Sequence, residues 1–265
     1  MERMWTDVID LRDFYWSGLG QIARRMIRRK LRTIWADTRD CRVLGLGFAT
    51  PYLRPFLDES ERVVAIMPSS QGVLPWPSEG PGVVCLADEA SLPLPDRSID
   101  RALLVHALES TEQVRPSLRE VWRVLADGGR LIVVVPNRRG IWARLDGTPF
   151  GQGRPYTPLQ LNRLLRDNMF TPLQTQAALF VPPFRSRFVL RSAPAWEKLG
   201  ERWFPTFAGV VIVEAAKQIY AGSAVHDLGE ATRRYMPIPQ GFRMDPNSGE
   251  AKVAPTAGWP AASPP

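Results

Sequence analysis

A pair of glycines and a histidine are the residues best placed to do chemistry. Gly45 and Gly47 end the run RVLGLG, and a glycine turn at the carboxyl end of a buried strand lets the backbone approach a ligand closely. His106, one of two histidines, follows the run DRALLV and could serve as a base near neutral pH. A pocket wall or a loop hydrogen bond is the alternative role for this side chain. The sequence has no metal-ligand spacing, nucleophile elbow or phosphate loop.

These candidates need a sheet to position them, and the alternation of runs along the chain predicts one. Short β-branched runs suit strands buried on both faces, and alternating strands and helices indicate a parallel sheet with right-handed crossovers. Helices are expected from Thr50 and Pro51, over residues 112–125, and from Thr157 and Pro158 to near Asn168. The expected strands are RVLGLG, RVVAIM, GVVCLA, DRALLV and RLIVVVP, the last after a turn at Gly128 and Gly129, with QAALFVPP and FAGVVIVEAAKQ closing the sheet.

Composition sets broad limits on the class of protein. The formal net charge of +7 favours anionic partners without selecting among nucleic acid, membrane surface and small acids. Cys41 and Cys85 lack metal or disulfide spacing and are expected to be buried reduced thiols. No apolar run reaches the roughly 18 residues that a spanning helix needs, and the amino-terminal stretch lacks an apolar signal region. These features predict a cytoplasmic protein.

Residues 18–35 form a basic amphipathic pattern. Ile22, Met26, Ile27, Leu31 and Ile34 recur at spacings of three and four, which predicts a helix with one apolar face. The opposite face carries Arg24, Arg25, Arg28, Arg29, Lys30 and Arg32. This face is either a solvated surface on a helix covering a sheet edge, or a binding surface for RNA phosphates or an anionic membrane.

The chain divides into three predicted parts. Residues 1–39 are the basic helical segment, and residues 40–221 carry the alternating strands and helices. Residues 222–265 lose this periodicity, and the stretch from Met236 to Pro265 holds seven prolines. Such a composition predicts a mostly disordered tail in which Trp259 could dock locally.

Three stretches together resemble class I S-adenosylmethionine-dependent methyltransferases of the type 11 branch. They are VLGLGFATPYL at residues 43–53, LADEASLPLPDRSIDRALLVHALE at 86–109, and LREVWRVLADGGRLIVVVPN at 118–137. The resemblance covers roughly residues 40–220, and FAGVVIVEAAKQ is similar to the antiparallel last strand of these enzymes. It implies a Rossmann-like, doubly wound, mostly parallel seven-stranded sheet with an antiparallel last strand and helices on both faces.

The resemblance also implies a cofactor site for S-adenosyl-L-methionine at the strand ends. Asp88, with Glu89 beside it, would meet the adenine amino group, while Arg154 and Tyr156 resemble positions that line the acceptor pocket. The residues implied to bind the cofactor are Gly45, Leu46, Gly47, Ala49, Met67, Asp88, Glu89 and His106.

The sequence departs from the family pattern at several of these positions. Gly45 replaces a common acid, and Ala49 and Pro51 replace the later glycines. The acid that would hold the ribose hydroxyls is replaced by Met67 or Pro68, which cannot accept a hydrogen bond from them. A lost bond to a charged group weakens binding about tenfold to a hundredfold, which Ser69, Ser70 or Gln71 could partly offset.

Two functions therefore stay open. One is an S-adenosylmethionine-dependent methyltransferase with an atypical cofactor site and an acceptor that the sequence does not name. The other is a catalytically inactive methyltransferase-like module that binds RNA or a protein partner. A different nucleotide ligand is a further alternative.

Overall fold

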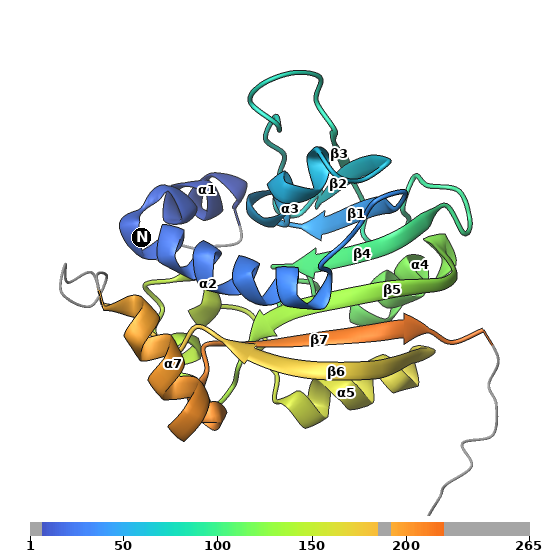
Figure 1. The fold of residues 1–265 in the computed structure, drawn as a ribbon. Coiled ribbons are helices and arrows are strands. Elements are labelled where there is room, and N and C mark those ends of the chain that lie inside the picture. Colours follow the sequence, from blue (N-terminus) through green and yellow to red (C-terminus); the bar gives the residue numbers. More distant parts are fainter. Residues whose placement is uncertain (1–6, 185–191, 220–265) are drawn as a thin grey trace, which may run out of the picture. The chain divides into compact units, whose positions relative to one another are not determined.

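Seven strands form one sheet in the order β3-β2-β1-β4-β5-β7-β6 (Figure 1). The structure is a computed structural model that describes residues 7–184 and 192–219. The strands are β1 (Arg42–Gly47), β2 (Arg62–Pro68), β3 (Val84–Ala87), β4 (Ile99–Val105), β5 (Leu125–Pro136), β6 (Phe170–Ala178) and β7 (Val210–Lys217). Strands β1 to β5 pair in parallel, whereas β7 is antiparallel to both β5 and β6. The predicted doubly wound sheet with an antiparallel last strand is confirmed.

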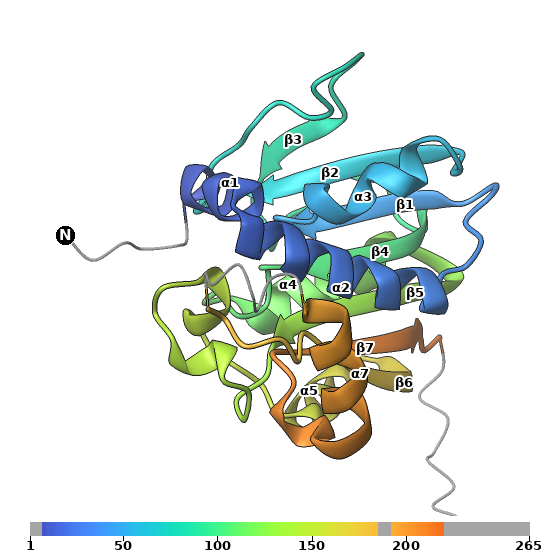
Figure 2. The ribbon, with the colours of Figure 1, turned by 60° about the vertical axis from the view of Figure 1, so that its left-hand side comes forward.

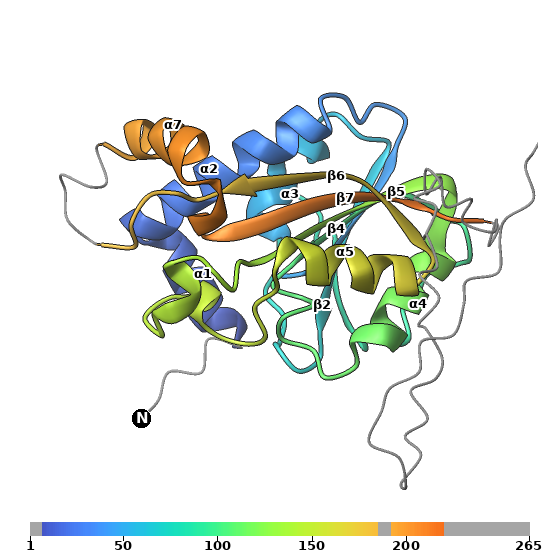
Figure 3. The ribbon, with the colours of Figure 1, turned by 90° about the horizontal axis from the view of Figure 1, so that it is seen from below.

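Helices cover both faces of this sheet, as Figure 3 shows from below. One face carries α1 (Val8–Trp16), α2 (Gly18–Ile34), α3 (Thr50–Leu57) and α7 (Ala193–Trp203). The other carries α4 (Val114–Val124) and α5 (Pro158–Asp167). Three single turns of 3-10 helix complete the described elements: Trp142–Arg144, Pro149–Gly151 and Pro205–Phe207.

The inner strands are buried on both sides because their side chains alternate between two apolar clusters. Leu103 and Val105 of β4 face α1, α2 and α3, whereas Ala102 and Leu104 face α4 and α5. All four side chains are buried. Since neither face of the inner strands meets water, they read in the sequence as continuous apolar runs.

The basic amphipathic helix predicted over residues 18–35 is confirmed as α2. Its apolar positions pack into the same cluster as the sheet residues beneath it, so it lies across one face of the sheet (Figure 2). Ser17 caps its amino end, with the hydroxyl accepting a hydrogen bond from the Gly20 amide. A side chain at Gly20 would place its Cβ 2.0 Å from the carbonyl oxygen of Phe14, so only glycine lets α1 and α2 approach this closely.

Local details differ from expectation at two turns. Helix α3 is capped by Ala49 without a side-chain hydrogen bond, not by Thr50 as the sequence suggested. The Gly128–Gly129 pair lies inside β5, where the pairing with β4 shifts register, because the strand already starts at Leu125. The predicted capping of α5 by Thr157 is confirmed, with Gln160 completing a capping box.

Other predictions concern the cysteines and the carboxyl-terminal tail. Cys41 and Cys85 are free thiols, as expected, but half-buried and not fully buried. Within the described residues, no helix is long and apolar enough to cross a membrane. The proline-rich tail, including Trp259, lies outside the described residues.

Candidate functional site

The two glycines at the end of β1 are held by contacts within the protein. Gly47 has a φ of +80°, and a Cβ there would lie 2.3 Å from the carbonyl oxygen of Val105. The amide of Phe48 donates a hydrogen bond of 2.8 Å to that same oxygen. A Cβ at Gly45 would lie 2.4 Å from the Leu53 side chain. The packing of β1 against β4 therefore requires glycine at position 47, whether or not a ligand is present, whereas a side chain at Gly45 would displace the Leu53 side chain.

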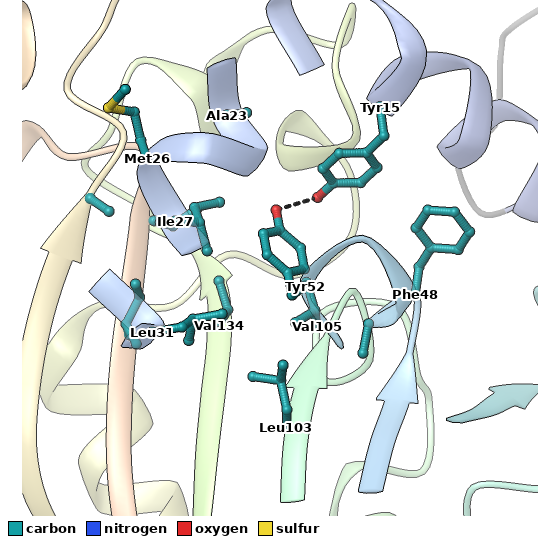
Figure 4. Packing of buried hydrophobic residues seen from close by; sticks show 14 of the residues in the cluster. Tyr15, Ala23, Met26, Ile27, Leu31, Phe48, Tyr52, Leu103, Val105 and Val134 are labelled. Atoms are coloured by element: carbon teal, nitrogen blue, oxygen red, sulfur yellow. Dashed lines mark hydrogen bonds between the residues drawn. The ribbon is translucent and has the colours of Figure 1, made fainter. Parts of the chain in front are cut away.

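Tyr15 of α1 covers this glycine turn. Its ring stacks on Phe48 with centroids 5.7 Å apart, and its hydroxyl lies 2.8 Å from both the Tyr52 hydroxyl and His106 Nε2. Figure 4 shows the two phenols directed at each other above the ends of β1 and β4. Burial raises the pKa of Tyr15 and of Tyr52, so both hydroxyls stay protonated and neutral near pH 7.

His106 belongs to a buried polar cluster in the loop after β4. Its side chain is 3% exposed, and the Phe150 ring lies 5.0 Å away between centroids. Its Nδ1 lies 3.2 Å from Glu109 Oε1 without hydrogen-bond geometry, and neither oxygen of that carboxyl group accepts a hydrogen bond from the described residues. Gln71 donates to the backbone carbonyl of His106. The imidazole thus faces Tyr15 and Glu109, and it does not border an open pocket.

A cavity of about 580 Å³ lies beside this cluster, at the carboxyl ends of β1 and β2. Its wall is formed by α1, α2, the start of α3 and the loop after β2. The residues that border it are Arg12, Tyr15, Trp16, Arg24, Phe48, Thr50, Pro51, Arg54, Met67, Leu74, Pro75, Trp76 and Ser78. Four are aromatic, three are arginines and none is acidic, so the wall combines flat apolar surface with positive charge.

The three arginines differ in how their charge is compensated. Arg12 pairs with Asp13 at 2.8 Å and lies over the Trp16 ring, and Arg54 pairs with Glu79 at 2.6 Å. Arg24 is half-buried and has no hydrogen bond or ion pair with any described residue. Its charge opposes the burial-driven rise in the pKa of Tyr15, which places the guanidinium in the electrostatic reach of that phenol. Arg24 is therefore a cation of the cavity wall without a counter-charge in the part of the chain that the structure describes.

The predicted cofactor residues are not brought together around this cavity. Met67 borders it, whereas the glycine-turn residues Gly45, Leu46, Gly47 and Ala49 are buried and do not line it, and Leu46 packs on the opposite face of the sheet. Asp88 is exposed, and its carboxylate accepts a hydrogen bond of 2.8 Å from the Ala90 amide. Glu89 accepts one from the Thr111 hydroxyl.

The two predicted acceptor-pocket residues lie beside the loop after β4, away from the cavity. Tyr156 donates to the Leu108 carbonyl at 3.4 Å, and the backbone amide of Arg154 donates to the backbone carbonyl of Glu109. Sequence reasoning missed the contribution of α1, which brings Arg12, Tyr15 and Trp16 to the site. The aromatic run just before the Ser17 cap was a signal that could have drawn attention to it.

Comparisons with known proteins agree on the fold. The model of the methyltransferase domain family matches residues 44–133. S-adenosylmethionine-dependent methyltransferases of Thermotoga maritima and Mesorhizobium loti superpose with TM-scores of 0.57 and 0.52, at 17% and 16% identity, covering 82% and 77% of this chain and 100% of each of theirs. This chain has the class I methyltransferase-like fold. The [4+2]-cyclase SpnF shares it, with a TM-score of 0.51 and 22% identity over 76% of this chain and 83% of its own.

Two sequence relatives of this chain are uncharacterised mycobacterial proteins. An uncharacterised protein of Mycobacterium tuberculosis is 27% identical over 145 residues, which cover 52% of this chain and 48% of the relative. An uncharacterised protein of Mycobacterium bovis matches equally. The chain thus spans about half the length of the curated relatives it matches.

S-adenosylmethionine fits this cavity only in part. Trp16 and Trp76 offer flat surfaces for an adenine ring, and Arg24 offers a partner for the carboxylate of the amino-acid end. The ribose hydroxyls and the sulfonium find no carboxylate, because Met67 stands where the resemblance implies an acid. The cavity therefore matches the two ends of the cofactor better than its cationic centre.

Proposed function

We propose that this chain is an S-adenosylmethionine-dependent methyltransferase with an atypical cofactor site in the cavity of about 580 Å³. The observation that carries the proposal is the place of this cavity, at the carboxyl ends of β1 and β2. Ligands of doubly wound sheets bind outside these strand ends, and the volume lies in the range of small-molecule sites. The family match over residues 44–133 supports the same function.

In this proposal, side chains of the cavity wall bind and align the cofactor. Trp76 packs on the adenine, Arg24 holds the carboxylate, and the hydroxyls of Thr50 and Ser78 are available to the ribose. The cofactor supplies an activated methyl group, and an in-line displacement needs mainly proximity and alignment from the protein. Tyr15 forms hydrogen bonds with His106 and Tyr52, and these bonds fix the position of its ring on the wall of the cavity.

Calorimetric titration with S-adenosylmethionine and S-adenosylhomocysteine tests the proposal directly. Binding of one or both at tens of micromolar is expected, and no heat at millimolar ligand would refute it. Met67→Asp adds the missing carboxylate at the cavity wall and should tighten S-adenosylmethionine about tenfold. Met67→Asn is the matched control, since it has the same shape without the charge. Thermal melting of both variants checks that the buried substitution leaves the fold intact.

The second candidate is a methyltransferase-like module without catalysis. It is favoured by the closed glycine turn, where Tyr15 and Phe48 occupy the approach that a ligand would use. A cyclase shares the fold, and a fold by itself does not imply one reaction. In this candidate, the exposed cations of α2 bind RNA or another anionic partner. The three exposed members are Arg25, Arg28 and Arg29.

A further inference from the structure

The electrostatics of the cavity favour a ligand that carries negative charge. Its wall holds three guanidinium groups and no carboxylate, and Arg24 has no counter-charge among the described residues. Partial burial of such a cation costs hydration free energy, and charge-assisted hydrogen bonds to a bound anion offset that cost. S-adenosylmethionine brings a sulfonium cation into the same space. The attraction between its carboxylate and the arginines is therefore opposed by the repulsion between its sulfonium and the arginines.

The amino end of α3 adds to this preference. Thr50 and Pro51, the first residues of α3, border the cavity, and no side chain caps the helix there. Such an amino end carries the positive end of the helix dipole and attracts anions, although Pro51 has no amide hydrogen and the Tyr52 amide already donates to the Ala49 carbonyl. Arg24 and this helix end thus converge on one cavity from different elements.

The aromatic residues of the wall indicate the rest of the ligand. Trp16 is 69% exposed, although large aromatic side chains of this kind are normally buried. Trp76 and Phe48 lie on the wall of the same cavity, and Leu74 and Met67 add apolar surface. The exposed Trp16 ring and the half-buried Trp76 ring, beside cations, form a surface on which a planar ring can stack while its acidic group meets an arginine.

We propose that this cavity is a binding site for a planar aromatic ring that carries a phosphate or carboxylate, with Arg24 as the residue that recognises the anion. Adenosine 5′-monophosphate is the probe, since it combines a planar ring with a phosphate. Adenosine is its matched neutral control. The inference goes beyond the methyltransferase proposal and does not depend on it, because it concerns charge recognition and no methyl transfer.

The experiment is a calorimetric titration of the full chain with both probes and with S-adenosylmethionine. Adenosine 5′-monophosphate should bind at least about tenfold more tightly than adenosine, which is the lower end for one hydrogen bond to a charged group. Arg24→Gln should abolish that difference. Arg25→Gln, an exposed neighbour on the same helix that does not border the cavity, should preserve it. Trp16→Ala should weaken both probes alike, because it removes stacking and no charge.

The outcomes separate the two proposals. Equal affinity for the two probes, no binding of either at millimolar concentration, or an unchanged preference in Arg24→Gln would overturn the anion site. If the Arg24 variant does not melt cooperatively, Arg12→Gln gives the second test, since Arg12 borders the same cavity at 34% side-chain exposure, and it should reduce the preference. Binding of S-adenosylmethionine without a preference for the phosphate would keep the methyltransferase and remove the anion site. A preference for the phosphate without binding of S-adenosylmethionine would keep the anion site and remove the methyltransferase.

Discussion

The Tyr15 hydroxyl is the link between α1 and the strand ends, and Tyr15→Phe removes it while keeping the ring. Two hydrogen bonds of 2.8 Å are lost, one to His106 Nε2 and one to the Tyr52 hydroxyl. Both partners are buried, at 2% and 0% exposure, so water does not replace the lost partner. Leaving a buried polar group unpaired costs about 1 to 3 kcal/mol, and two such groups give an expected loss of about 2 to 6 kcal/mol.

Tyr52→Phe is the matched comparison. It removes only the bond between the two phenols, because Tyr15 keeps His106 as a partner. The expected cost is about 1 kcal/mol, near that of one ordinary hydrogen bond. The free energy of unfolding should therefore fall clearly more in Tyr15→Phe than in Tyr52→Phe, and the double variant should be less than additive.

Urea unfolding followed by circular dichroism measures these differences, provided that the slope with denaturant is the same in all variants. Adenosine 5′-monophosphate affinity should be unaffected, since the ring that borders the cavity is retained. If the two single variants lose equal stability, or if Tyr15→Phe loses less than about 0.5 kcal/mol, the hydroxyl does not hold α1 on the sheet and the network is incidental.

Three further predictions follow from other contacts. Gly47→Ala should lower the melting temperature far more than Gly80→Ala, because both have positive φ but only the first Cβ meets backbone, 2.3 Å from an oxygen. The hydrogen-bonded Arg42 side chain lowers the pKa of the Asp100 carboxyl, so the stability that this pair adds is present above about pH 4 and lost as the pH falls further. Denaturant titrations from pH 7 to 3 should therefore show the stability gap to Asp100→Asn closing on acidification, and a constant gap would contradict this cause. If α2 binds single-stranded RNA through exposed cations, affinity should fall about 0.7 log unit per log unit of salt for each phosphate contacted. Gel-shift assays should then show weaker RNA binding by a variant in which Arg25, Arg28 and Arg29 are all replaced by Gln. Equal binding by this variant and the unchanged protein would mean that the surface is only solvated.

The sheet was predictable because its signals are local. The buried strand β4 ends in the apolar run ALLV, and the capping box that starts at Thr157 marks the beginning of α5 within four residues. Errors arose where tertiary pairing overrides a local cue. The Gly128–Gly129 pair has the form of a turn, but pairing of Leu125 with Ile99 extends β5 through it. Contacts across the sheet decide such boundaries, and one sequence does not display them.

The site was less predictable because its decisive contacts are distant along the chain. Tyr15 meets His106 across 91 positions and Tyr52 across 37. The basic face of α2, seen as one surface in the sequence, is divided by the fold: Arg24 borders the cavity, and Lys30 pairs with Glu201. A helical periodicity gives the side of a helix on which a residue lies, but it does not give what packs there.

The glycine motif is weak evidence about the ligand in this chain. Gly47 is required by a backbone contact with Val105 and Gly45 is favoured by the contact with the Leu53 side chain, and neither contact involves a ligand, so the motif would persist even if cofactor binding were lost. What distinguishes a working cofactor site is instead the charge presented at the strand ends. There, Met67 supplies no acid, and Arg24 supplies a cation that has no ion pair with any residue the structure describes. A cavity with this charge selects first for anions, and its use for a cationic methyl donor therefore depends on the carboxylate end of that donor reaching Arg24.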